Sequence, residues 1–150
     1  MIELDFNVRR SSDSANIDWT WANEMLLRYD SFLWDIRFVV GDLDLSMDWG
    51  WIPVLDFALS LRHIGQRLYQ GDSAVFDFTD SDLTITSSVR EMKVVQIEAS
   101  YVDGVGVTDV DEFCESARGF LSRVRRHIEK EVPEIQTNPR YLNLLKGEFT

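Results

Sequence analysis

Few side chains in this chain could act as catalytic groups. The sequence has two histidines, His63 and His127, and one cysteine, Cys114. Neither histidine stands beside an acid or a nucleophile in a recognisable catalytic pattern, so we expect both to be ordinary helix residues. Acids surround Cys114 in the sequence, and neighbouring carboxylates raise the pKa of a thiol, which disfavours a reactive thiolate. We therefore predict that the chain has no catalytic residues and is not an enzyme.

Carboxylates are abundant enough to raise the question of a metal site. Asp77, Asp80 and Asp82 cluster around one turn, but the segment lacks the glycine and the terminal glutamate of a calcium-binding loop. A single cysteine excludes a disulfide within the chain and a zinc site made of cysteines. The three aspartates are therefore predicted to be solvated turn residues, and neither a metal nor a cofactor is expected.

One enzymatic alternative stays open. Asp82, followed by Glu91-Met92-Lys93, is similar to the pattern of metal-dependent nucleases of the restriction-endonuclease type. In those enzymes carboxylates hold the divalent ion and a lysine steadies the attacking water. The pattern is short, and a chain with a net charge of −11 offers no basic surface to hold a polyanion. A nuclease is therefore the less favoured interpretation.

The remaining chemical signal is the arrangement of the acids. Asp42, Asp44, Ser46 and Asp48 alternate with apolar residues, so in a strand they share one face with about 6.8 Å between successive members. Residues 72–82 contain four acids and no base, and residues 98–115 contain six acids and no base. Negative charge is thus concentrated in three stretches of the chain.

Two tryptophans follow the first acidic stretch directly, in the run Trp49-Gly50-Trp51. They either close the core or expose an aromatic ring among acids, a mixture typical of interaction hot spots. Since no catalytic constellation competes with it, we predict a partner-binding surface here. Its candidate residues are Asp42, Asp44, Asp48, Trp49, Trp51, Asp77, Asp80 and Asp82.

The overall charge restricts the kind of partner. The chain has 26 acids and 15 bases, and its sequence pI is about 4.5. Such a surface repels nucleic acid and anionic lipid and attracts cationic proteins, so neither direct nucleic-acid binding nor membrane binding is expected. Mimicry of nucleic acid is a weaker alternative, because the acidic strip carries one charge per about 6.8 Å whereas one DNA strand carries one per about 3.4 Å.

The periodicity of apolar residues predicts the elements that position these groups. Alternation predicts strands over residues 2–8, 17–21, 32–40 and 43–49, the last two joined by a hairpin at Gly41-Asp42. A helical stripe predicts a helix over residues 53–70, ended by Gly71.

The second half of the chain repeats the order of strands followed by a helix. Strands are predicted around residues 74–78, 83–85 and 92–101, followed by a short connection flanked by Gly104 and Gly106. A helix capped at Thr108 or Asp109 runs to Pro133, and a short helix capped by Asn138 ends at Gly147. This order predicts a single α+β domain over residues 1–150, with a mainly antiparallel sheet packed with two amphipathic helices and a short C-terminal helix.

The location is predicted from the absence of targeting signals. The segment Met1–Asp5 lacks the basic region and apolar run of a signal peptide. No apolar stretch approaches the roughly 18 residues that a membrane span needs. We therefore expect a cytoplasmic protein.

In layout and composition, the chain resembles the small acidic immunity proteins of bacterial toxin systems, including contact-dependent inhibition and secreted polymorphic toxins. The resemblance is carried by Trp51–Ala58 at the start of the first long helix, by the strands between Ala74 and Tyr101, and by the amphipathic helix from Asp109 to Val132. It implies an antidote that covers the active site or substrate groove of a cognate protein toxin, such as a basic nuclease. Another acidic binding module or a nucleic-acid mimic is the alternative, and the oligomeric state stays open.

Overall fold

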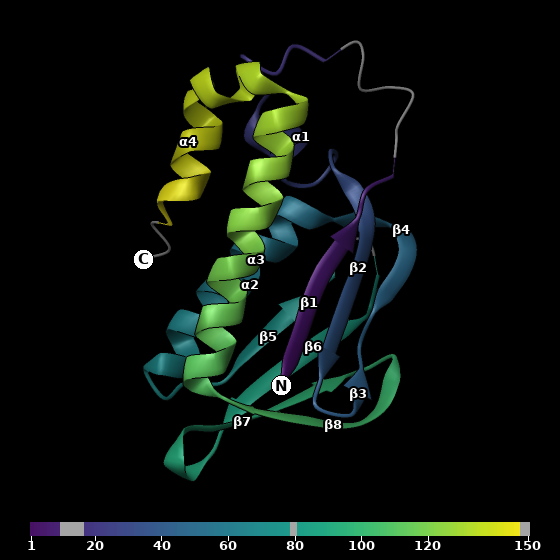
Figure 1. Ribbon diagram of the computed structural model, residues 1–150, viewed down its shortest axis with the longest axis vertical. Helices are drawn as coiled ribbons and strands as arrows, with labels where there is room; N and C mark the ends of the chain where they lie inside the picture. The colour runs from purple at the N-terminus through teal and green to yellow at the C-terminus, as the bar shows by residue number, and fades with distance from the viewer. Residues whose placement is uncertain (10–16, 79–80, 148–150) are drawn as a thin grey trace.

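The computed structural model describes residues 1–9, 17–78 and 81–147. Two four-stranded antiparallel sheets and two long helices enclose one hydrophobic core (Figure 1). The predicted α+β class is confirmed, including the antiparallel pairing and the short helix near the C-terminus. The sequence predicts one sheet, whereas the chain forms two.

The first sheet is built around β2 (Leu33–Val40). β1 (Ile2–Asn7) pairs with one edge of β2, and both β3 (Leu43–Asp44) and β4 (Met47–Pro53) pair with the other edge. All of these pairs are antiparallel. Because strands pair with both of its edges, β2 forms the centre of the sheet. Its inward residues are buried.

The predicted hairpin at Gly41-Asp42 is confirmed, with Gly41 at a φ of 59° that suits glycine. The strand predicted over residues 43–49 is instead interrupted at Leu45 and Ser46. The Ser46 hydroxyl accepts the N–H of Phe38 at 3.1 Å, a bond that a main-chain carbonyl would accept in a regular ladder. The local polar side chain therefore splits the predicted strand into β3 and β4.

The second sheet is a meander in which each strand pairs with the next: β5 (Ala74–Asp77), β6 (Thr84–Val89), β7 (Val94–Ala99) and β8 (Val102–Asp109). The strand predicted from Met92 begins later, because a short 3-10 turn, η2 (Glu91–Lys93), precedes it with Met92 at a φ of 60°.

The predicted connection around Gly104 and Gly106 is wrong, because both glycines lie within β8. β8 passes under the β2–β3 turn (Figure 1). A Cβ atom at Gly106 would lie 2.8 Å from Cβ of Val40, so the close approach of the two sheets requires glycine there. The glycines therefore mark a crossing of strands rather than a loop.

Two helices lie side by side against the sheets (Figure 1). α2 (Val54–Tyr69) follows Pro53, and α3 (Val110–Glu131) is capped by Asp109, whose side chain accepts the N–H of Glu112. Both helices match the predicted positions within a few residues. Burial of their apolar stripes joins both sheets into the same core.

The predicted strand over residues 17–21 is wrong. The segment forms a turn and leads into the short helix α1 (Glu24–Arg28), capped by the Asn23 side chain. Trp19 is 4 % exposed whereas Trp21 is 68 % exposed, so the alternating tryptophans do not share a face. The buried Asn138 side chain donates to the carbonyls of Trp19 and Ala22 and holds the segment in its non-strand form.

The C-terminal prediction is confirmed. A 3-10 turn, η3 (Pro133–Thr137), leads to α4 (Pro139–Lys146), which Asn138 caps and Gly147 ends in the left-handed conformation. The Arg62 guanidinium of α2 donates to the carbonyls of Leu144 and Leu145 at the end of α4. No helix of the described residues has the length and apolar character that crossing a membrane requires.

Candidate functional site

The acidic strip predicted after Gly41 is displayed outward. Asp42, Asp44 and Asp48 are exposed, while the apolar residues between them, Leu43, Leu45 and Met47, are buried. The alternation predicted from the sequence therefore holds in burial even though the strand is interrupted. The even strand spacing between successive acids does not persist across Leu45 and Ser46.

Asp44 is held ionised by its local contacts. The hydroxyl of Ser46 and then its N–H, at 2.9 Å from Asp44 Oδ1, lower the pKa of the Asp44 carboxyl below its ordinary value. Arg37 adds a smaller attraction, and its guanidinium forms an ion pair with Glu3. The Asp44 carboxylate therefore stays ionised below the usual titration range of aspartate.

The two tryptophans lie on a large bulge of β4. Met47 pairs with Ile36 and Ile52 pairs with Trp34, so four residues of β4 stand opposite Asp35 alone. The rings of Trp49 and Trp51 stack at a centroid distance of 5.2 Å, and both are half-buried.

Gly50 sits between the two tryptophans at a φ of 74°. The Arg9 guanidinium packs so close that a Cβ atom at Gly50 would lie 2.7 Å from its Nη1 atom. Arg9 also donates to Asp35 on β2 at 2.9 Å. The Arg9 guanidinium that pairs with Asp35 therefore packs against Gly50, where both the positive φ and the close contact favour glycine.

Ring contacts link the bulge to the second sheet. The Trp49 ring lies 5.7 Å from Phe78 and 5.0 Å from Tyr101, and Trp51 lies 6.3 Å from Phe78. Phe78 is 3 % exposed, so the tryptophans close the core on this side. The Tyr101 hydroxyl donates to the Leu45 carbonyl at 2.7 Å, and burial, then the charge of Asp44, raises the pKa of Tyr101.

These contacts bring together two acidic stretches that are distant in sequence. Phe78 immediately follows β5, so the end of that strand lies next to the bulge. Asp77 and Asp82 are exposed, while the predicted Asp80 lies outside the described residues. We call this region the acidic–aromatic surface; its members are Asp42, Asp44, Asp48, Trp49, Trp51, Asp77, Asp82 and Tyr101, and the buried Phe78 ring packs beneath the tryptophans.

The acids of this surface are not neutralised by the described part of the chain. None of Asp42, Asp44, Asp48, Asp77 and Asp82 forms an ion pair with a described residue. The third acidic stretch differs, because Asp109 caps α3 and Glu112 accepts the Thr108 hydroxyl and pairs with the N-terminal amine. Part of that stretch therefore has structural roles.

The nuclease-like residues are not assembled into a site. Asp82 precedes β6 and Glu91 follows it, so a six-residue strand, roughly 20 Å long without its flanks, separates them. The Lys93 ammonium lies over the Tyr69 ring at 5.6 Å. The described residues also contain no cluster of three or more His, Cys, Asp or Glu side chains placed to hold a metal ion.

The three conventional catalytic side chains have packing contacts. His127 lies 5.3 Å from the Trp34 ring and 5.7 Å from the Phe6 ring. The Cys114 thiol donates to the Gly65 carbonyl at 3.3 Å where α2 and α3 meet, and burial raises its pKa. His63 lines a groove beside α2, and burial, then the charges of Arg67 and Arg28, lower its pKa.

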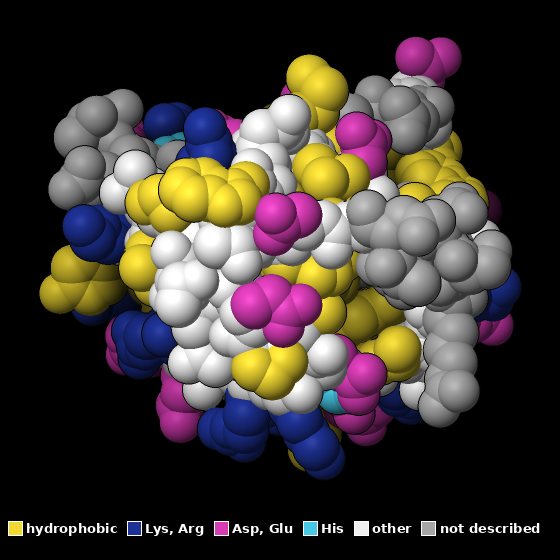
Figure 2. Space-filling view, turned by 90° about the horizontal axis from the view of Figure 1, so that it is seen from above, with side chains coloured by type: hydrophobic (Ala, Val, Ile, Leu, Met, Phe, Trp, Pro, Cys, Tyr) yellow, Lys and Arg dark blue, Asp and Glu magenta, His cyan; other side chains and the backbone are white. Residues whose placement is uncertain are grey.

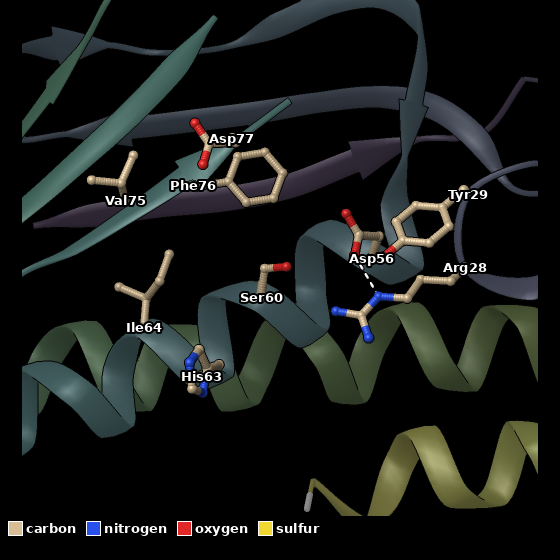
Figure 3. A pocket seen from close by; sticks show the side chains of 9 residues that line it. All are labelled: Arg28, Tyr29, Asp56, Ser60, His63, Ile64, Val75, Phe76 and Asp77. Atoms are coloured by element: carbon tan, nitrogen blue, oxygen red, sulfur yellow. Dashed lines mark hydrogen bonds and ion pairs between the residues drawn. The ribbon is translucent and has the colours of Figure 1, made fainter. Parts of the chain in front are cut away.

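That groove is a feature that the sequence patterns do not predict. It has a volume of about 290 Å³ and lies between α2 and β5, with α1 at one end (Figure 3). A buried ion pair joins Arg28 Nε to Asp56 Oδ1 at 2.6 Å. Burial raises the pKa of Asp56, against the opposing effect of the Arg28 and Ser60 hydrogen bonds. Figure 3 shows the Ser60 hydroxyl turned toward Asp56 rather than His63, so no nucleophilic triad is formed.

A second feature missed from the sequence is an exposed apolar stripe on and beside α1. Trp21, Met25 and Tyr29 are all exposed and are spaced four residues apart. Seen from the end of the molecule that carries α1, apolar side chains and carboxylates share the middle of the face, and Lys and Arg side chains lie toward its rim (Figure 2). The spacing of Trp21 and Met25 would indicate this stripe only if α1 had been predicted, because residues four apart share a face in a helix.

Compared with known proteins, the chain matches no family, no curated protein and no solved structure.

Proposed function

We propose that this chain binds a cationic protein through the acidic–aromatic surface and that it acts as an immunity protein that neutralises a cognate toxin. The observation that supports this most directly is the meeting of the two acidic stretches at the Trp49, Phe78 and Tyr101 rings. The rings give the surface a rigid base, and the acids around it carry charge that no described cation neutralises. Rigid aromatic contact area surrounded by charge suits a protein partner.

Electrostatics favours a basic partner. A net charge of −11 attracts cationic proteins over long distances and increases the association rate. The exposed carboxylates of Asp42, Asp44 and Asp48 then lie where cationic side chains of the partner would pair with them. A toxin that acts on nucleic acid needs a basic substrate groove, and covering such a groove requires an acidic surface.

The immunity assignment adds the biological role to this binding mode. It is supported by the resemblance in layout and composition to small acidic immunity proteins, and it implies a cytoplasmic location, where an antidote would meet an incoming toxin. A nucleic-acid mimic would use the same acids. The two roles differ in that a mimic competes with DNA for many DNA-binding proteins, whereas an antidote binds one cognate toxin.

A charge-matched pair of variants tests the proposal. The triple variant Asp42→Asn, Asp44→Asn, Asp48→Asn removes three charges from the surface. The control triple Glu91→Gln, Glu115→Gln, Glu134→Gln removes three from exposed positions elsewhere, so both net charges become −11 + 3 = −8. Each protein is immobilised and used to capture partners from lysate of the cell that produces it, and bound proteins are identified by mass spectrometry.

We expect a basic protein that the wild type and the control triple retain and that the surface triple loses. Expressed alone, that protein should arrest growth, and co-expression of the wild type should restore growth. Equal retention by the two triples, or a captured partner that is acidic, would contradict the proposed surface. A partner that is harmless to the cell would leave the surface intact and refute the immunity role.

A further inference from the structure

β5 is an edge strand of the second sheet. In the strand order β5-β6-β7-β8, only one side of β5 is hydrogen-bonded to a neighbouring strand. Ala74, Val75, Phe76 and Asp77 pair with residues 84–87 of β6. The other side of the strand faces the groove beside α2 (Figure 3). An open strand edge next to a groove is a geometry that accepts an additional strand.

The hydrogen-bond pattern shows which main-chain groups face the groove. The N–H of Phe78 donates to the Leu83 carbonyl at 3.1 Å, so Phe78 faces β6. In an antiparallel ladder the main-chain groups of successive residues point to opposite sides of the strand. The N–H and C=O of Phe76 therefore also point to β6, and those of Val75 and Asp77 point away from it. The Ser73 carbonyl fits this pattern, because it points outward and accepts hydrogen bonds from the Arg67 guanidinium.

These outward groups are available for pairing. Within the described part of the chain, no main-chain group outside the sheet bonds to the N–H or C=O of Val75 or Asp77. Val75 is 53 % exposed, so the described residues leave it only partly covered on the outer face of the strand. Across the groove, α2 presents Ser60, His63 and Ile64.

We propose that β5 accepts an antiparallel strand from an extended, basic segment of the partner, which pairs with Val75 and fills the groove beside α2. This inference rests on the proposed function for the identity of the partner, while the strand edge does not contain Asp42, Asp44 or Asp48. It adds a second contact of a different kind, in which main-chain hydrogen bonds supplement charge pairing.

The surroundings of the strand define the chemistry of the segment. The residue opposite Val75 exchanges two hydrogen bonds with it and points to the outer face, and its neighbours point into the groove. On the α2 side of the groove, Arg28 and Asp56 neutralise each other, so an uncharged, apolar side chain fits there, next to Ile64. Two positions along, the outward residue lies beside the exposed Asp77, where a lysine or arginine is favoured.

Amide hydrogen exchange of the protein alone tests the strand edge without any ligand. If the alternation is right, the amides of Ala74 and Phe76 exchange slowly, because they are bonded to β6. The amides of Val75 and Asp77 should exchange at least about tenfold faster. Equal protection of all four amides would mean that the edge is covered, and the proposal would be wrong.

A displayed library of random nine-residue peptides serves as the binding probe. We expect the wild type to enrich peptides in which a basic residue stands directly next to an apolar residue, because the apolar side chain points into the groove and the basic one lies beside Asp77. Val75→Pro removes the outward N–H, which an edge strand tolerates, and should weaken the selected peptides about tenfold. The matched control Val75→Thr keeps the N–H and should change the affinity by less than about twofold.

The two proposals fail in different ways. Loss of peptide binding in Val75→Pro, with retention in the Asp42, Asp44 and Asp48 triple, supports strand addition at β5. If no peptides are enriched, or if the Pro and Thr variants bind equally, strand addition is wrong while the partner capture by the acidic–aromatic surface stands on its own test. If the partner is captured equally by both triples but loses affinity with Val75→Pro, the edge is the docking site and the acidic–aromatic surface is not.

Discussion

Asn138 joins the C-terminal helix to the segment before α1, and its replacement by alanine is the most informative stability test. The side chain is fully buried. Its Oδ1 atom accepts the N–H of Arg140 at 2.9 Å, and Nδ2 donates to the carbonyls of Trp19 and Ala22 at 2.8 and 2.9 Å.

Loss of the helix cap costs about 1 kcal/mol. Two buried carbonyls without their donor cost about 1 kcal/mol each. We therefore expect Asn138→Ala to lower the free energy of unfolding by about 3 kcal/mol.

Urea denaturation followed by tryptophan fluorescence and by circular dichroism measures this loss. The matched control is Asn23→Ala, which removes the cap of α1 at an exposed position and should cost only about 1 kcal/mol. Asn138→Ser keeps a cap but cannot reach both carbonyls, so its cost should lie between these values. If Asn138→Ala costs no more than Asn23→Ala, the two long-range hydrogen bonds do not hold the segment, and the reasoning is refuted.

Three further predictions concern packing and pH. Gly106→Ala places a methyl group 2.8 Å from Val40 Cβ and should lower the free energy of unfolding, measured in urea, by about 2 kcal/mol; an unchanged midpoint would contradict the strand crossing. A Cβ atom at Gly65 would lie 3.2 Å from the Cys114 thiol, so Gly65→Ala should raise the melting temperature more in a Cys114→Ala background than in the wild type; an equal change in both would contradict the contact. Because the Asp56 pKa is raised, the folded state binds its proton more tightly than the unfolded state. The stability of the wild type relative to Asp56→Asn should therefore increase as the pH falls from 7 toward 4; an increase with rising pH would contradict the burial.

Elements whose start and stop signals are local are predicted from the sequence. Asp109 caps α3, and Asn138, Pro139 and Gly147 delimit α4, because caps and breakers act within one turn of the residues they control. The segment before α1 fails for the opposite reason. Its alternating apolar residues fit a strand, but the contacts that decide its conformation come from a residue more than a hundred positions away.

The candidate site divides in the same way. Alternation predicts that the Asp42, Asp44 and Asp48 side chains point outward, and the structure agrees. The contact of the tryptophans with Phe78 and Tyr101 depends on how two sheets meet, which no local pattern encodes. The sequence does not predict the groove beside α2. Asp56 stands among the apolar residues of α2, and it indicates a groove only once its ion-pair partner Arg28 is known, which lies on the unpredicted helix α1.

Amide hydrogen exchange of the protein alone and in complex with the captured basic partner tests the central claim most directly. The account predicts new protection of the segments that carry the acidic–aromatic surface, residues 42–51, 77–78, 81–82 and 101, with little change on the solvent face of α3. Protection confined to α3 and α4, with residues 42–51 exchanging as in the free protein, would contradict it.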